Sequence, residues 1–322
     1  MTRRNAENSW KVLLLSAAFL FTGCTGSEEE SPVPIRLTAE STSLSTGSRG
    51  AGVISPGSAF NPTFIASRTE NDFTTTRVEW SDPAKVDAQG KVTFQSTHPY
   101  PAFGEWVYIT GVHPQATPSQ GKVTYTLDGT TDVMYAKTLK GNKWDSNRFE
   151  GNTQSRYDRA FCFIHLLTQL QVKAKKQNAD GLAFTIKKIT VKGINGTLSV
   201  TLADGTTTFG NGNTDIAVSG DAISKTPVTG TEAVPITNLL LPPSEAGSFT
   251  IDIETSAGTF KDVKVSIDKK DTGSGDPPEE QKGFLAGYAH EIMLTIHDSE
   301  LEITVNIVPW EDTEGGNIDL VD

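Results

Sequence analysis

The chain is poor in cysteine, in basic residues and in long apolar runs. Its 322 residues include only two cysteines, Cys24 and Cys162, and 28 basic against 39 acidic residues, a net charge of −11. Such an acidic chain lacks the basic surface that nucleic acid or anionic lipid requires. The apolar run at residues 12–21 is shorter than the roughly 20 residues that a membrane-spanning helix needs. About 300 residues can, however, form two domains of ordinary size.

Residues 1–23 have the features of a secretory signal peptide: a basic start, a short apolar body and small residues at the end. Thr22, Gly23 and Cys24 resemble the lipobox of bacterial lipoproteins, although Phe21 departs from the usual aliphatic residue. In a lipoprotein the cysteine becomes the first residue and carries fatty acyl chains such as palmitate, which anchor it firmly. The alternative is an ordinary signal peptide with an incidental cysteine. With Cys24 acylated, Cys162 would have no disulfide partner.

Four residues close to Cys24 indicate where the protein is sent: Ser27, Glu28, Glu29 and Glu30. An acidic cluster directly after a lipidated cysteine resembles the surface-export signal of Bacteroidota lipoproteins. A solvated acidic tether is the alternative. The sequence therefore predicts a surface-exposed lipoprotein of the outer membrane.

Short alternating apolar segments, separated by Gly, Asn, Asp and Pro, dominate the rest of the chain, and helical periodicity is scarce. This pattern is typical of β-sandwiches, so we expect an all-β fold with few short helices. The segments that we expect to be strands are VTYTL (123–127), FTIKKITVKGI (184–194), GTLSVTL (196–202), FTIDIET (249–255) and VKVSI (263–267).

Two further segments show strand patterns. In residues 290–310, one strand face carries Ile292, Leu294 and Ile296, and the returning strand carries apolar residues at 301, 303, 305 and 307, which predicts a hairpin. Residues 161–175 begin apolar on both faces, which predicts a central strand that is covered on both sides, with a short helix as the alternative that periodicity alone allows. A polar turn at 176–181 follows, and we expect the domain boundary there, with domains at 51–180 and 181–322.

We find no catalytic constellation and expect no cofactor or metal. HEIMLTIH lacks the second histidine of the zincin motif, and His290 and His297 would lie on opposite faces of a strand. We expect Cys162, between two phenylalanines, to be desolvated and inert. The aspartates of residues 268–276 lack the spacing of a calcium loop. Four aromatic residues could form a sugar platform, although core or loop anchors are commoner in sandwiches: Tyr100, Phe103, Trp106 and Trp144.

Several segments together resemble the fimbrillin family of Bacteroidales, the type V pilins. They are the lipobox, residues 161–175 followed by 184–194, DVMYAKT (132–138) and the terminal GFLAGYAHEIMLTIHDSELEITVNIVPWED. The resemblance implies two tandem transthyretin-like β-sandwich domains in a fimbrial subunit that supports adhesion. It also implies that a trypsin-like protease removes an N-terminal strand after an arginine. A strand from another copy or a related fimbrillin subunit then fills the groove.

The residues allow this reading. Residues 24–50 would form the lipidated tether and the removable strand, because Ile35, Leu37 and Ala39 alternate as in a strand. Arg49, the one basic residue between positions 40 and 52, is the candidate cleavage site. A monomeric surface lipoprotein that binds glycans or another host ligand is the alternative function.

Overall fold

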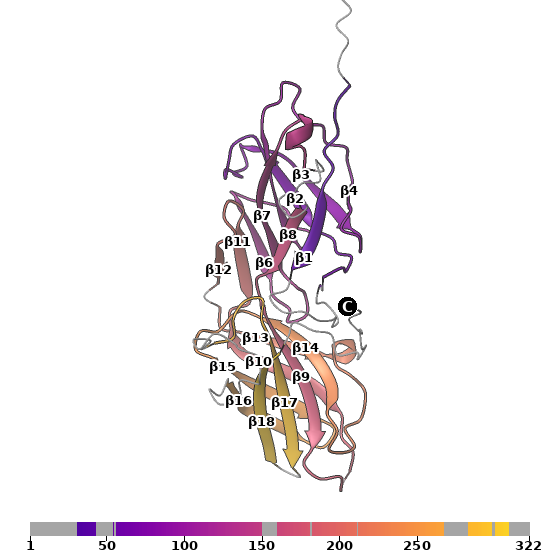
Figure 1. Cartoon of the computed structure of the whole chain (residues 1–322). Coiled ribbons are helices and arrows are strands. Elements are labelled where there is room, and N and C mark those ends of the chain that lie inside the picture. Colours follow the sequence, from indigo (N-terminus) through magenta and orange to yellow (C-terminus); the bar gives the residue numbers. More distant parts are fainter. Residues whose placement is uncertain are drawn as a thin grey trace, which may run out of the picture. The chain divides into compact units, whose positions relative to one another are not determined.

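A computed structural model of the protein describes residues 31–42, 54, 56–149, 160–180, 182–210, 212–266, 283–297 and 300–308. In this part the chain forms β-strands and two 3-10 helices, η1 (Asp145–Asn147) and η3 (Gly220–Ala222) (Figure 1). All the strands belong to one compact unit, residues 33–322. No helix in the described ranges is long and apolar enough to span a membrane. The expected all-β class is confirmed.

The first sheet has seven strands in the order β1-β8-β7-β5-β2-β3-β4. β1 runs parallel to β8, whereas the other neighbouring pairs are antiparallel. Their bounds are β1 (Thr38–Thr42), β2 (Thr63–Ser67), β3 (Val78–Val86), β4 (Val92–Phe94), β5 (Val107–His113), β7 (Met134–Gly141) and β8 (Ala160–His165). The inner face of this sheet packs around an aromatic cluster in which Phe64 contacts Phe161 and Phe163 edge to face, at 5.2 and 5.8 Å between ring centroids.

A three-stranded outer sheet contains strands from distant parts of the chain. β6 (Lys122–Thr126) pairs with β11 (Thr197–Thr201), and β11 pairs with β12 (Thr207–Phe209). Tyr135 of β7 is buried beside this sheet, where its hydroxyl donates to the Leu202 carbonyl at 3.2 Å. One apolar core continues from this outer sheet into the strands that follow.

Two four-stranded sheets form a β-sandwich around that core, which we call the second sandwich because it follows the first sheet and the outer sheet. One sheet contains β13 (Thr214–Ser219), β10 (Ile186–Ile194), β15 (Ser248–Thr255) and β16 (Thr259–Ser266). The other contains β14 (Val234–Leu241), β9 (Thr168–Lys176), β17 (Ala289–His297) and β18 (Glu300–Val308). β15 shows why these residues form strands, since every second side chain is buried along its whole length.

The predicted hairpin at residues 290–310 is confirmed in its described part. β17 and β18 are antiparallel, and Ile292 lies opposite Val305, Leu294 opposite Ile303. The connecting turn and Trp310 lie outside the described residues.

The prediction of one covered strand at 161–175 is wrong for its first part, because the segment forms two strands and only the second, β9, is central in its sheet and buried on both faces at its start. The chain leaves the first sheet after β8, turns at Leu166 and Leu167, and enters the second sandwich as β9. β8 buries Phe161 and Phe163 on one face, whereas Ile164 on the other is 52% exposed. β9, in contrast, lies between β14 and β17 in its sheet, and its first five side chains, Thr168 to Val172, are all buried. The division into domains at about residue 180 stays a prediction.

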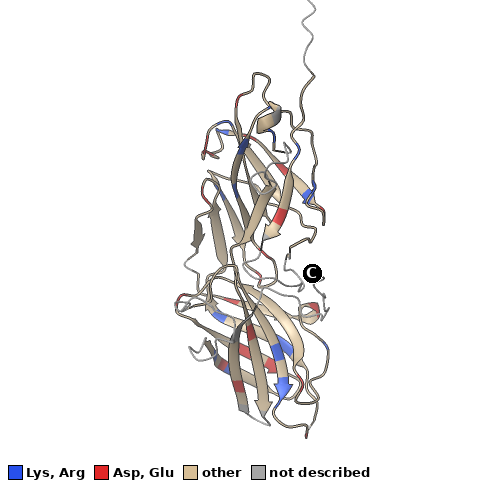
Figure 2. Ribbon diagram, viewed as in Figure 1, with Lys and Arg blue, Asp and Glu red and all other residues tan. Residues whose placement is uncertain are grey.

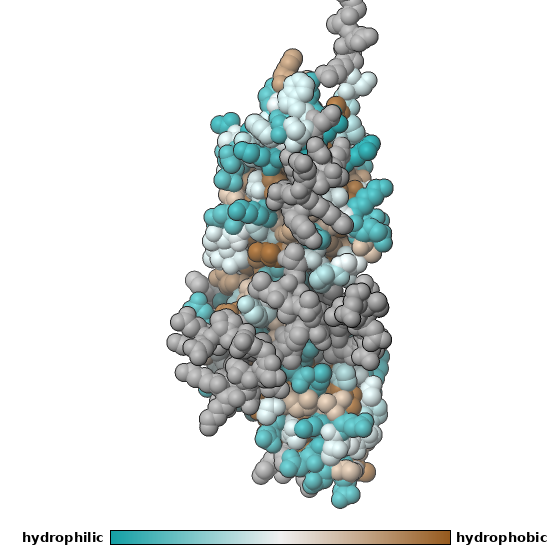
Figure 3. Space-filling model, in the orientation of Figure 1, coloured by the Kyte–Doolittle hydropathy of each residue, from teal (hydrophilic) through white to brown (hydrophobic). Residues whose placement is uncertain are grey.

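The surface is mixed in charge and hydropathy. Basic and acidic residues occur on neighbouring strands of the second sandwich (Figure 2), where Lys173 of β9 pairs with Glu291 of β17 at 2.7 Å. On the face seen in Figure 3, hydrophobic residues of the described part are scattered among hydrophilic ones.

Candidate functional site

The segment of residues 33–42 is the candidate functional site, because it is an N-terminal strand inserted into the first sheet. Ile35, Leu37 and Ala39 are buried and belong to the inner core of that sheet. Arg36 and Thr38 between them, and Glu40 after them, are exposed. The alternation expected from the sequence is therefore present in the structure.

Hydrogen bonds hold this segment along both of its edges. On one edge, residues 38–42 form the parallel ladder of β1 with β8. On the other edge, the amide of Ile35 donates to the carbonyl of His98 at 2.7 Å, and the amide of Ala39 donates to Gly90 at 2.8 Å. In the reverse direction, the amides of residues 92 and 100 donate to the carbonyls of residues 37 and 33, at 3.2 and 2.8 Å. The segment thus joins the two ends of the first sheet.

Gly90 allows the close approach of the segment. Its backbone has a φ of +79°, a conformation that favours glycine, and a Cβ placed there would lie 2.8 Å from the carbonyl oxygen of Ala39. A side chain at position 90 would therefore push the segment away from this edge.

A histidine and an aspartate order the loop that receives the start of the segment. His98 Nε2 lies 2.7 Å from Asp82 Oδ2, and the same oxygen accepts from the amide of Ser96 at 2.9 Å. The imidazole also stacks on Trp80, with ring centroids 4.0 Å apart. These contacts fix the backbone carbonyl of His98, which accepts from Ile35.

A second histidine and aspartate hold the chain after the segment. His165 Nδ1 lies 2.9 Å from Asp132 Oδ2, which also accepts from the amide of Ile54 at 3.1 Å. Both side chains are buried, so His165 is a core histidine with a hydrogen-bonded ring. Residues 33–42 and Ile54 are therefore both attached to the first sheet, and the stretch that contains Arg49 lies between them.

Cys162 lies beside residues 33–42, and its thiol is less buried than the sequence analysis predicted. It is only partly buried, and its Sγ is 3.6 Å from Glu40 Oε1 on the neighbouring strand. Burial and the adjacent carboxylate both raise the pKa of the thiol. A thiol that stays protonated is a poor nucleophile, so the inference of low reactivity holds for a partly different reason.

The remaining candidate residues are scattered. Cys24, Ser27, Glu28 to Glu30 and Arg49 lie outside the described residues, as do the aspartates of 268–276. His290 is fully buried, and the described part of the chain contains no group of three His, Cys, Asp or Glu side chains that could hold a metal. Tyr100 is buried in the core, where its hydroxyl accepts from the amide of Phe149 at 2.8 Å, so it cannot belong to a surface platform.

Comparison with known proteins agrees with this architecture. Residues 62–310 match the model of the fimbrillin-like family, most of the chain. The chain therefore belongs to the fimbrillin-like family. No curated protein matches it in sequence.

Solved structures share the fold. A protein provisionally assigned to cell adhesion from Bacteroides ovatus is 13% identical, with a TM-score of 0.57 and coverage of 88% of this chain and 100% of that one. A similarly assigned protein from Bacteroides uniformis is 16% identical, with a TM-score of 0.52 and coverage of 85% and 99%. One from Parabacteroides distasonis is 10% identical, with a TM-score of 0.51 and coverage of 88% and 98%. Identities this low establish the fold alone.

Proposed function

We propose that the protein is a structural subunit of a cell-surface fimbria, and that it assembles by exchanging residues 33–42 for a strand of another subunit. Membership of the fimbrillin-like family supports a fimbrial role. The observation that carries the exchange is the state of this segment, which is hydrogen-bonded along both edges and buries alternate side chains.

Loss of the segment would leave a large defect in the first sheet. It would uncover the backbone groups of β8 and of residues 90–100, and unpaired strand edges are templates for another strand. It would also empty the sites of Ile35 and Leu37. At about 1.5–3 kcal/mol for each large apolar side chain, the lost burial is about 3–6 kcal/mol, as an upper bound. Domains are stable by only about 5–15 kcal/mol, so the defect favours refilling.

A strand from another copy or from a related fimbrillin subunit would restore both the hydrogen bonds and the buried area by β-augmentation. Before cleavage, the resident segment is tethered to the sheet and outcompetes any separate strand, which keeps the precursor monomeric. Cleavage after Arg49 by a trypsin-like protease removes that advantage, since the segment can then diffuse away.

The proposal includes the route to the cell surface. Cys24 is the lipidation site that anchors the precursor in the outer membrane, and Ser27 with Glu28 to Glu30 forms the signal for surface export. Neither role requires a cofactor or a nucleic-acid partner, and the protein is not an enzyme in this scheme.

Limited trypsin treatment of the purified precursor tests the exchange. Cleavage should give a new N-terminus at Gly50 and oligomers that resist SDS without boiling. Arg49→Ala should stay monomeric under the same treatment. Arg36→Ala is the matched control, because Arg36 lies within the doubly hydrogen-bonded segment and should not be a cleavage site, so this variant should assemble normally. A trimmed protein that stays monomeric at high concentration, or equal assembly of Arg49→Ala, would contradict the proposal.

A further inference from the structure

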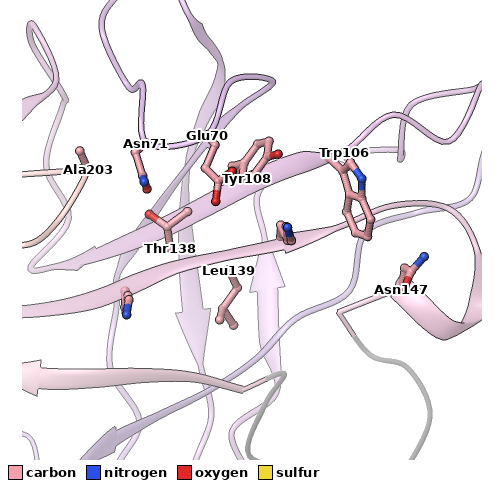
Figure 4. Close-up of a pocket in the computed structure, with 10 residues that line it drawn as sticks. Glu70, Asn71, Trp106, Tyr108, Thr138, Leu139, Asn147 and Ala203 are labelled. Atoms are coloured by element: carbon pink, nitrogen blue, oxygen red, sulfur yellow. The ribbon is translucent and has the colours of Figure 1, made fainter.

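A second feature of the first sheet lies apart from residues 33–42. An open groove of about 530 Å³ runs over β5 and β7, a volume within the roughly 300–1,000 Å³ of small-molecule sites. Figure 4 shows Trp106 and Asn147 at one end, with Glu70, Asn71 and Tyr108 farther along. The groove includes no residue of the inserted segment.

Local backbone features bring polar groups into this groove. β7 has one extra residue opposite β5, between the pairs Ile109–Leu139 and Gly111–Ala136, so Lys137 and Thr138 both line the groove. Such β-bulges redirect side chains and are frequent next to functional sites. Asn71 has a φ of 55°, a left-handed conformation that asparagine adopts more readily than most residues.

The chemistry of the groove suits a sugar. Trp106 remains 37% exposed and offers an aromatic surface against which the apolar side of a pyranose ring can lie. The amides of Asn71 and Asn147 and the carboxylate of Glu70 supply both donors and acceptors for hydroxyl groups. An apolar surface with a few placed polar groups is the usual composition of a ligand site.

The charges of the groove indicate which kind of sugar. Lys137 and Lys140 outnumber Glu70, so the groove is locally positive in a chain whose net charge is −11. Lys140 Nζ lies over the Trp106 ring, 5.3 Å from its centroid, which places an ammonium group at one face of the aromatic surface. A carboxylate on a sugar that rests against Trp106 would therefore meet a cation.

We propose that this groove binds a carbohydrate that carries a carboxylate, such as a sialic or uronic acid unit. The site shares no residue with the inserted segment, so binding neither requires nor prevents strand exchange. The proposal would hold for a monomeric protein as well as for an assembled one. Its failure and the failure of the fimbrial proposal are thus separate outcomes.

The test uses the purified full-length chain and four probes: 3′-sialyllactose, a hyaluronan tetrasaccharide, lactose and inorganic phosphate. In titration calorimetry, we expect at least one acidic probe to bind with a Kd below about 1 mM. Lactose should bind at least about tenfold more weakly than that probe. Absence of binding by both acidic probes would overturn the proposal. Equal binding of lactose would overturn the acidic class, and full displacement by phosphate at equal concentration would show an anion site only.

Trp144 and Lys143 provide matched controls. Lys143 Nζ lies 4.9 Å from the centroid of the exposed Trp144 ring, so this pair repeats the geometry of Lys140 and Trp106 but does not line the groove. Trp106→Ala and Lys140→Glu should each weaken the acidic probe about tenfold or more, whereas Trp144→Ala and Lys143→Glu should not.

Trp106→Phe, which keeps an aromatic surface, should retain most of the affinity. If Trp106→Ala and Trp144→Ala weaken binding equally, the effect comes from exposed aromatic residues in general, and the proposed site is wrong. Thermal unfolding of each variant separates loss of binding from loss of fold.

Discussion

Replacement of Leu37 by alanine should loosen residues 33–42 selectively. Leu37 is 3% exposed and belongs to the inner core of the first sheet. Truncation of a buried leucine costs about 2–5 kcal/mol, because both transfer energy and packing are lost. The segment comes early in the described chain and is held by its own side chains and backbone bonds. Most of this cost should therefore lower the free energy of local opening.

Hydrogen exchange can measure that opening. The amides at positions 35, 39, 92 and 100 form the bonds between the segment and residues 90–100, so they exchange only when the segment detaches. A loss of 2 kcal/mol corresponds to an increase of about 30-fold in the exchange rate of these four amides, as each 1.4 kcal/mol is a factor of ten. Trypsin-triggered assembly should also become faster, since the cleaved segment leaves more easily.

Leu294→Ala is the matched control, because Leu294 is equally buried but lies in β17 of the second sandwich. It should lower global stability without selective exchange at those four amides. If the two variants give the same exchange pattern, the segment does not open separately from the rest of the unit, and the reasoning behind strand exchange is wrong.

Three further predictions concern other parts of the chain. Gly90→Ala should weaken attachment of the segment and speed assembly in the trypsin assay. Gly57→Ala should not, because Gly57 has a similar φ of +75° but a Cβ placed there would have no atom within 4 Å. Equal effects of the two substitutions would exclude the contact with Ala39 as the cause. Burial lowers the pKa of His290 from 6.5 to about 4, so the folded state favours the neutral ring, and stability should be complete above pH 6.5 and fall as the pH drops toward 4. The free energy of unfolding should fall by up to about 3 kcal/mol over this pH range, as measured by urea unfolding. His290→Phe should abolish this fall, and an unchanged pH profile in that variant would show that His290 is not its cause. Cys24→Ala should release the protein from the membrane fraction, and alanines at Glu28 to Glu30 should leave it membrane-bound but protected from protease added to whole cells; continued shaving of that variant would refute the export role.

The sequence predicted the strands better than their partners. The hairpin of β17 and β18 was recognisable because apolar residues alternate on both strands, and each of the five other predicted segments overlaps a strand of the structure. The corner at Leu166 and Leu167 was missed, because two leucines continue an apolar pattern where a turn residue would have marked a break. The pairing of β6 with β11 was invisible for another reason, since alternation reveals a buried face but not the strand that lies alongside.

The candidate site was predictable only in part. The alternation at Ile35, Leu37 and Ala39 predicted a buried strand, but nothing nearby in the sequence points to His98 or Gly90 as its partners. Likewise, Glu70 and Asn71 line the groove although their loop is far from Trp106 in the sequence, and no local sequence pattern predicts that these residues lie together. Sequence distance hides contacts that tertiary structure creates.

The parallel pairing of β9 with β17 has a consequence for the timing of folding. β9 lies between β14 and β17 in its sheet, and the contact of Thr168 with Tyr288 spans 120 residues. Such long-range pairings form slowly, because the entropy of closing the loop is lost before the stabilising contacts form. At a synthesis rate of about 5–20 residues per second, several seconds pass between the synthesis of β9 and that of its parallel partner β17. Because β18 also belongs to this sheet, the second sandwich cannot be completed until residue 308 has been synthesised, so its core stays open until synthesis of the chain is nearly finished.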